Sequence, residues 1–282
     1  MAAVLALLSA VLFGAGDFFG GTAARRTHVL VVVAASHVIG LVMILAVAPV
    51  MADAVTGQDL VYGALAGLFG LLGIGCLYHC LGRGPMAIVA PITAISNAVL
   101  PVLWGVAHGE RLSAVNTAGV LLGLAAIGLV SGGTGIRRLI DAASVPPTLV
   151  FEALLAGVGF AGFYICMNAT TEASTPWPLV SARVVSAGLA LLLLLRVGRS
   201  PIPRRAEGGV AVVFAGLLDM TANLAILLAI HRGLLSLTVV LSSLYPATTV
   251  ILARTVLDEQ MSRNQVAGVA ATLIAVACIV AG

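Results

Sequence analysis

The chain alternates long apolar runs with short polar connections. A helix needs about 20 mostly apolar residues to cross the hydrocarbon layer of a membrane, and ten runs reach or approach that length. They cover residues 2–20, 29–50, 60–80, 86–107, 114–131, 148–170, 178–196, 209–230, 235–256 and 264–281. The runs are too long for barrel strands, and unpaired backbone groups are not tolerated in lipid. The predicted fold class is therefore all-α: a polytopic membrane protein with ten transmembrane helices.

Composition supports a membrane protein. Of the 282 residues, 61% are hydrophobic and 9% are charged, whereas soluble domains usually carry about 25% charged residues. The net charge of +3 comes with no cluster of basic residues. We therefore expect the lipid bilayer as a partner and no binding of nucleic acid.

The pattern of turns and charges occurs twice, with a spacing of 149 residues. LGRGPMAIVAPITAISNAVLP in the first half aligns with the stretch that begins at Ile230 in the second. The matched positions are Arg83 with Arg232, Glu110 with Glu259, Ser113 with Ser262, and Gly119 with Gly268. Five spans per half is an odd number, so the second half must enter the membrane in the opposite orientation. We expect two inverted five-helix repeats, residues 1–135 and 148–282, joined by a linker at 136–147.

Arginine, the only strongly basic residue type, is distributed unevenly among the connections. Connections after odd-numbered spans hold Arg25, Arg26, Arg83, Arg137, Arg138, Arg196, Arg199, Arg204, Arg205 and Arg263, whereas those after even-numbered spans hold only Arg111 and Arg232. The positive-inside rule then places both termini outside the cytoplasm.

Several helix starts carry local signals. Pro147 and Pro178 stand where a missing N–H costs nothing. Ser262 and Gln265 form a capping box before the last run, and Ser113 begins a weaker copy of that motif.

Charged groups inside apolar runs are candidates for function, because a charge at mid-membrane costs at least about 2.5–3.5 kcal/mol. Asp17 lies near the end of span one, Arg183 early in span seven, and Asp219 in the middle of span eight. Either acid could bind a cation or a proton, and Arg183 could bind a carboxylate. The alternatives are an Arg–Asp pair that only locks two helices together, and an Asp17 that reaches water at the membrane face.

Uncharged polar residues extend the set. Asn223 follows Asp219 by one helical turn, and His37 matches Arg183 when the halves are aligned by their serine-rich turns. Spans four and nine combine hydroxyl and amide groups with prolines that permit bends, although Ser and Thr often bond only to their own helix. The candidate pathway residues are Asp17, His37, Asn97, Tyr164, Arg183, Asp219, Asn223 and Tyr245.

No cofactor, metal ion or catalytic centre is expected. Cys76, His79 and Cys80 share one helix face, but a zinc site would need a further ligand pair. Glu152 lies close enough to the end of its span to reach water. The chain contains no HExxH, GxSxG or glycine-rich phosphate loop. We therefore expect a protein that is not an enzyme.

The ordered set of motifs resembles the EamA-like branch of the drug/metabolite transporter superfamily. The resemblance rests on FGAGDFFGG at the end of span one, GRGPMAIVAPI before span four, LSLTVVLSSLYPATTVILAR in span nine, and the paired turns GERLS and DEQMS. It implies a ten-helix carrier of small polar metabolites in the cell membrane, often an exporter. Many members keep both termini in the cytoplasm, which is opposite to the arginine count, so the orientation stays open.

Two functions remain. The first is a secondary transporter that moves a small polar, amino-acid-like solute, with export favoured, by alternating access. The second is a proton-coupled multidrug or cation efflux transporter, against which the aromatic content of 5% counts. Protons are a candidate coupling ion, and the sequence does not indicate an oligomeric state.

Overall fold

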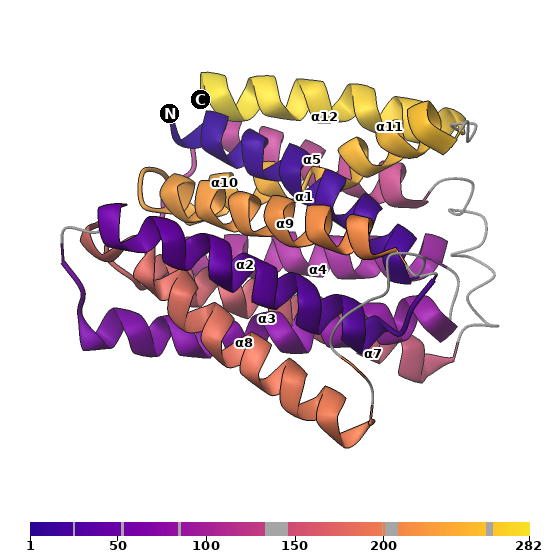
Figure 1. Cartoon of the computed structure of the whole chain (residues 1–282). Helices are drawn as coiled ribbons and strands as arrows, with labels where there is room; N and C mark the ends of the chain where they lie inside the picture. Colours follow the sequence, from indigo (N-terminus) through magenta and orange to yellow (C-terminus); the bar gives the residue numbers. More distant parts are fainter. Residues whose placement is uncertain are drawn as a thin grey trace.

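The computed structural model describes residues 1–24, 26–51, 54–83, 86–132, 146–198, 200, 208–257 and 262–282. All regular structure in these ranges is helical, as expected (Figure 1). The helices are α1 (Ala2–Ala24), α2 (Val29–Met51), α3 (Gly57–Arg83), α4 (Met86–Ala107), α5 (Ala114–Gly132), α7 (Pro147–Asn168), the 3-10 turn η2 (Glu172–Ser174), α8 (Trp177–Arg196), α9 (Gly209–Ile230), α10 (Leu235–Ser242), α11 (Tyr245–Leu257) and α12 (Arg263–Ala281). Arg25, Arg137, Arg138, Arg199, Arg204, Arg205, Glu259 and most of the expected linker 136–147 lie outside the described residues.

The helices have the length and composition of membrane spans. Within the described ranges, seven are long and apolar enough to cross a bilayer: α1, α2, α3, α7, α8, α9 and α12. Shorter apolar stretches lie at Ile92–Ala107, Ala114–Val130 and Leu235–Thr248. The chain is therefore a multi-pass membrane protein.

The ninth apolar run, expected as a span at 235–256 with a bend at Pro246, is not one continuous helix. The run consists of α10 and α11, with Ser243 and Leu244 in a turn between them. Pro246 accounts for the interruption, because its ring lacks an N–H and clashes with the carbonyl four residues earlier in a continuous helix. The two short helices meet inside the bundle, where Leu241, Ser242 and Ser243 are at most 1% exposed.

Helix starts follow the local signals of the sequence. Ser262 and Gln265 form the expected capping box at α12, and the Ser113 hydroxyl accepts from the Asn116 amide at 3.0 Å. The start of α10 is capped from another part of the chain, since Glu110 Oε1 accepts from the Leu235 amide at 2.6 Å. Glu110 therefore ties the α4–α5 connection to the second half of the chain.

Small residues let α5 and α12 pack closely. A Cβ atom added at Gly119 would lie 2.8 Å from Ile279, and one added at Gly268 would lie 2.7 Å from Val130. Early residues of each helix thus meet late residues of the other, so the two helices run antiparallel. Gly268 lies 149 residues after Gly119, and Ile279 lies 149 after Val130, so each contact is the repeat image of the other.

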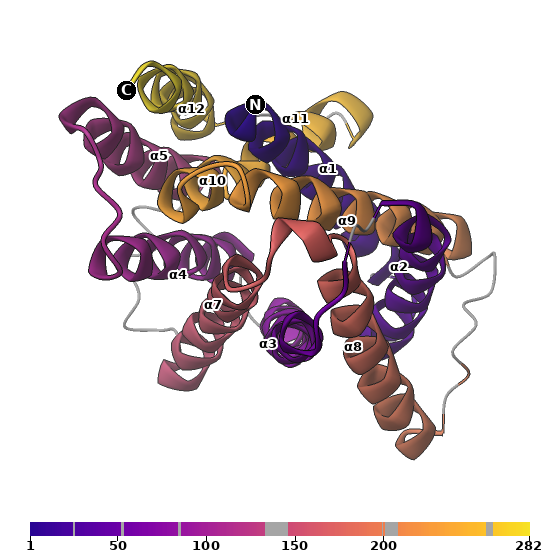
Figure 2. The same cartoon turned by 90° about the vertical axis from the view of Figure 1, so that its left-hand side faces the viewer.

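Helix α3 lies between α7 and α8 (Figure 2). Gly63 and Gly67 bring its backbone against the backbone of α8 at Pro178 and Ala182. On the other side, α1 packs along α9, and α2 contacts both α8 and α9. These six helices surround the middle of the bundle and position the site described next.

Candidate substrate pathway

A cavity of about 90 Å³ lies between α1, α2, α3, α7, α8 and α9, enough space for several water molecules. Its lining comprises Phe13, His37, Ala66, Gly67, Gly70, Ile74, Phe160, Phe163, Tyr164, Leu179, Ala182, Arg183, Ser186, Asp219 and Asn223. Five of the eight candidate residues from the sequence are in this set: His37, Tyr164, Arg183, Asp219 and Asn223. Asp17, Asn97 and Tyr245 are not.

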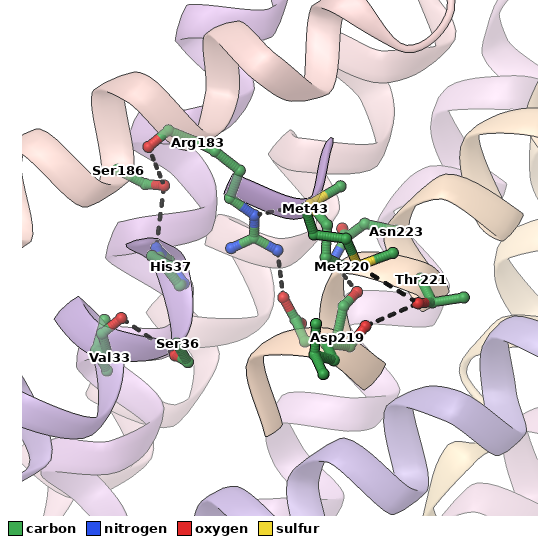
Figure 3. A network of polar contacts seen from close by, with 11 residues as sticks. Val33, Ser36, His37, Met43, Arg183, Ser186, Asp219, Met220, Thr221 and Asn223 are labelled. Carbon is green, nitrogen blue, oxygen red and sulfur yellow. Dashed lines mark hydrogen bonds and ion pairs between the residues drawn. The ribbon is translucent and has the colours of Figure 1, made fainter. Parts of the chain in front are cut away.

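The charged groups of the cavity form an ion pair between α8 and α9, which both pack on α2. Arg183 of α8 donates from Nη2 to Asp219 Oδ2 of α9, and its Nε approaches the Met220 sulfur at 3.4 Å (Figure 3). Arg183 is 8% exposed, whereas the Asp219 side chain is 38% exposed. A guanidinium has five N–H donors, and the bonds described for Arg183 use two of them. The pair can therefore accept a further anionic partner.

His37 of α2 bonds to α8 rather than to a charged residue. Its Nδ1 and the Ser186 hydroxyl lie 3.0 Å apart in a hydrogen bond (Figure 3). The partner of His37 on α8 is thus Ser186, which lies three residues after Arg183, the residue to which the serine-rich turns match His37. Both side chains are buried, at 8% and 3% exposed.

Asn223 lies on the same face of α9 as Asp219, as its spacing predicts. Its Nδ2 donates to the Asp219 backbone carbonyl at 2.7 Å, and both residues line the cavity. The Asn223 side chain is therefore held by its own helix with its amide beside the ion pair.

Asp17 of α1 lies next to this ion pair without lining the cavity. A Cβ atom added at the preceding residue, Gly16, would lie 3.5 Å from the Asp219 amide nitrogen. The carboxyl groups of Asp17 and Asp219 repel each other electrostatically. The structure thus gathers two acids and one guanidinium at the junction of α1, α8 and α9.

Comparison with known proteins assigns this arrangement to a family. The model of the EamA-like transporter family matches residues 1–132 and again residues 148–281. The chain belongs to the EamA-like transporter family. The two matches establish its two-repeat architecture, and the family consists of transporters of the drug/metabolite transporter superfamily.

A solved structure shares the fold of this EamA-like protein. It is described only as "Crystal structure of protein", and it matches with a TM-score of 0.75 and 21% sequence identity, over 98% of this chain and 95% of the other. The comparison with curated protein sequences finds no significant match.

Three candidate residues of this EamA-like transporter meet at the break in its ninth apolar run. Asn97 of α4 donates from Nδ2 to the Ser243 hydroxyl at 3.4 Å. Tyr164, which also lines the cavity, is hydrogen-bonded to Ser242, and Tyr245 is the first residue of α11. The cavity and the helix break are therefore connected through Tyr164.

Glu152, which the sequence places at a membrane face, is partly exposed and pairs with an exposed histidine and a buried cysteine of α3. Its Oε2 lies 3.1 Å from His79 Nδ1 and 3.5 Å from the Cys80 thiol. No sequence signal indicated this contact, because it joins α3 to α7 over 73 residues.

Among the described residues, no group of three or more His, Cys, Asp or Glu side chains is arranged to hold a metal ion.

A polar cluster at one end of the EamA-like bundle was missed by sequence reasoning. Asp59 accepts from the Thr171 amide at 3.0 Å, from the Thr171 hydroxyl at 2.7 Å and from the Ser174 hydroxyl at 2.7 Å. Thr56 caps the same helix start, with its hydroxyl accepting from the Asp59 amide at 3.1 Å. The signal that could have found it is this T-x-x-D pattern before an apolar run. Asp59 thus fixes the α7–α8 connection to the start of α3.

The other side of that connection is held by the residues after α9. The His231 ring nitrogens bond the hydroxyls of Thr170 and Thr175, each at 3.1 Å, and Arg232 pairs with Glu172 at 2.8 Å. Burial lowers the pKa of His231 below its ordinary value. Both chain termini lie at this same end of the bundle (Figure 1), where these polar contacts join the α7–α8 connection to α3 and to the residues after α9.

Proposed function

We propose that this EamA-like protein is a secondary transporter that moves a small polar, amino-acid-like solute across the cytoplasmic membrane, with export favoured. The solute binds in the central cavity, and the protein exposes it alternately to the two sides. The observation that carries the proposal is the Arg183–Asp219 ion pair, which lies beside an open cavity and not in a packed core.

The proposed architecture is ten spans in two inverted repeats, residues 1–135 and 148–282. Antiparallel α5 and α12, with their two mirrored glycine contacts, support the inversion. So does the pairing of helices, since α1 packs on α9 as α3 packs on α7. In such carriers the site lies near the middle of the membrane at the interface of the repeats, and the cavity is lined by helices of both repeats, which supports the proposal.

The ion pair suits a solute that carries both charges. Separating a buried pair is unfavourable unless each member gains a new partner. A zwitterion supplies both, because its carboxylate can accept from Arg183 while its ammonium group binds Asp219, with Asp17 beside it. Binding would then exchange one internal pair for two contacts with the solute, which compensates for its removal from water.

Alternating access also requires an end that can open. The hydrogen bonds of Asp59 and His231 hold the α7–α8 connection against α3 and the end of α9, together with the one exposed ion pair of Arg232 and Glu172. Polar contacts of this kind can exchange for water when the end opens. We propose that they form the closed gate of the present conformation.

The second candidate is a proton-coupled transporter that exports drugs or other cationic compounds, and one observation favours it. Phe13, Phe160, Phe163 and Tyr164 gather at the cavity although aromatic residues are only 5% of the chain. Aromatic faces beside carboxyl groups attract hydrophobic cations. In this alternative Asp17 or Asp219 exchanges a proton for the compound.

Reconstituted liposomes separate the two candidates. Purified full-length protein is assayed for flux of a panel of labelled amino acids and of hydrophobic cations, with Arg183→Gln and Asp219→Asn as variants. Saturable flux of a zwitterion that both variants abolish supports the first candidate. Saturable flux of a cation that survives Arg183→Gln and is lost in Asp219→Asn supports the second. Failure to find saturable flux of any solute under any gradient would overturn both.

A further inference from the structure

The break between α10 and α11 places helix-end carbonyls inside the bundle. Across the break, the Ser243 amide donates to the Val239 carbonyl, the Leu244 amide to the Leu241 carbonyl, and the Ala247 amide to the Leu244 carbonyl. The first of these bonds is a regular helical bond, whereas the other two span three residues, so the regular ladder is interrupted between residues 241 and 247. The last carbonyls of a helix lack intrahelical partners and carry partial negative charge. The end of α10 is thus an electronegative point in an apolar environment.

A buried side-chain oxygen without a donor lies at this break. Asn97 is 2% exposed, and its amide is anchored there by the bond from Nδ2 to Ser243. No described residue donates to its Oδ1. A buried acceptor in this state is unfavourable, and such groups in folded proteins usually have a ligand or an ordered water as partner.

Hydroxyl oxygens complete the surroundings. Ser242 and Ser243 are fully buried, and the Ser242 hydroxyl lies 2.7 Å from that of Ser9 on α1. An orphaned amide oxygen, serine hydroxyls and helix-end carbonyls form an environment selective for positive charge.

We propose that this break is a binding site for Na⁺, held by Asn97 Oδ1, the Ser243 hydroxyl and carbonyls at the end of α10. Neutral oxygens suit a monovalent cation, because divalent ions are usually held by carboxylates directly. Interrupted helices hold Na⁺ in this way in other transporters. Since Asn97, Ser242 and Ser243 are at most 2% exposed, an ion at this site would be separated from bulk water, and the comparison of Na⁺ with K⁺ below tests its identity.

The site is connected to the cavity. Tyr164 lines the cavity and bonds Ser242, while Asn97 joins α4 of the first repeat to α10 of the second. An ion that draws α4 onto α10 therefore fixes the position of Tyr164 beside the solute. This coupling role rests on the proposed function, whereas the binding of Na⁺ does not.

The binding is tested by thermal unfolding of the full-length protein in detergent, titrated with NaCl while choline chloride keeps the ionic strength constant. A saturable rise of Tm with Na⁺, absent with K⁺, is expected. Asn97→Ala abolishes the rise. Asn97→Asp, measured at pH 8, retains it and lowers the half-saturating Na⁺ concentration by about tenfold, because the ligand becomes charged.

The matched control is Asn116→Ala. Asn116 Oδ1 is also buried without a described donor, but it lies in the first turn of α5 beside the chain terminus, away from the break. This variant keeps the full response to Na⁺. Equal Tm values in NaCl and choline chloride, or a response that persists in Asn97→Ala, would overturn the site and indicate an ordered water there.

The outcome is independent of the transport assay. A Na⁺-specific rise in Tm that is lost in Asn97→Ala supports the site even where no solute flux is detected. Solute flux without any cation-specific change in Tm overturns the site and leaves the proposed function intact.

Discussion

His37 and Ser186 are separated by 149 residues in the sequence and joined by a hydrogen bond of 3.0 Å in the structure. That separation is also the spacing of the internal repeat, so each residue is the repeat equivalent of the other. In an arrangement with two-fold symmetry, equivalent residues can meet only at the axis. In the proposed inverted arrangement of the two repeats, the bond would therefore lie on the two-fold axis that relates them, at the wall of the cavity.

Removing one partner of this bond is expected to destabilise the protein. Ser186→Ala leaves the buried His37 ring nitrogen without its partner and should lower the free energy of unfolding by about 1–3 kcal/mol. Ser36→Ala is the control, because Ser36 is only half-buried and bonds to its own helix at Val33; its expected effect is below about 0.5 kcal/mol. Denaturation in mild detergent measures both, and equal effects would contradict a specific role of the His37–Ser186 bond.

The ion pair in the cavity should contribute to stability as well as to transport. Arg183→Met leaves Asp219 without its partner, with an expected loss of about 1–3 kcal/mol, less than for a fully buried pair because Asp219 is partly exposed. Adding Asp219→Leu should restore part of that loss, which a double-mutant cycle measures.

The exposed pair of Arg232 and Glu172 is the comparison for that cycle. Its side chains are 38% and 52% exposed, so its coupling energy should be about 0–1 kcal/mol. A coupling energy for Arg183 and Asp219 no larger than this would show that the cavity pair adds nothing beyond a surface contact.

Close packing of α3 on α8 predicts a strong effect of one methyl group. Gly67→Ala forces a side chain against the α8 backbone at Ala182 and should cost about 1–3 kcal/mol. Gly75→Ala, on the same helix with nothing within 4 Å of the added atom, should be neutral or stabilising by up to about 1 kcal/mol. Thermal unfolding of the two variants tests this, and the reverse order would refute the packing described for α3.

The His231 cluster predicts a dependence of stability on pH. Burial lowers the pKa of His231 in the folded protein from its ordinary value of 6.5, so the unfolded chain binds a proton more readily. The contribution of the neutral His231 ring to the free energy of unfolding is then fully present above pH 6.5. It is lost as the pH falls from 6.5 towards the lowered pKa of His231 in the folded protein. Nearby Glu172 and Asp59 act in the opposite direction but do not outweigh burial.

Thermal unfolding between pH 8 and pH 5 measures the effect. The Tm of the unmodified protein should fall below about pH 6.5, and His231→Gln, which keeps hydrogen-bonding capacity without a titrating ring, should flatten that part of the curve. His28→Gln is the control, because His28 is a partly exposed histidine that directly precedes α2. A pH dependence unchanged by His231→Gln would remove His231 from the gate.

The sequence by itself determined features that depend on neighbouring residues. The length of apolar runs predicted the helices, and the capping box at Ser262 was confirmed because its atoms lie within one turn. Pro246 indicated a bend in the ninth run, but whether the helix would bend or break depends on the packing around it. The two-repeat architecture was readable from the spacing of turns because each turn is a local motif.

Only the tertiary structure decided which distant residues meet. Arg183 and Asp219 were recognisable as a candidate pair because a charge in an apolar run is costly, whereas the contacts of Glu152 with His79 and of Asp59 with Ser174 had no counterpart in local pattern. Those contacts depend on how closely α3 approaches α7 and α8, and that approach is set by the glycines of α3 and the shapes of the facing helices. Helix formation is governed by local bonds, while pairing between helices is governed by the fit of whole surfaces, and no short stretch of sequence encodes that fit.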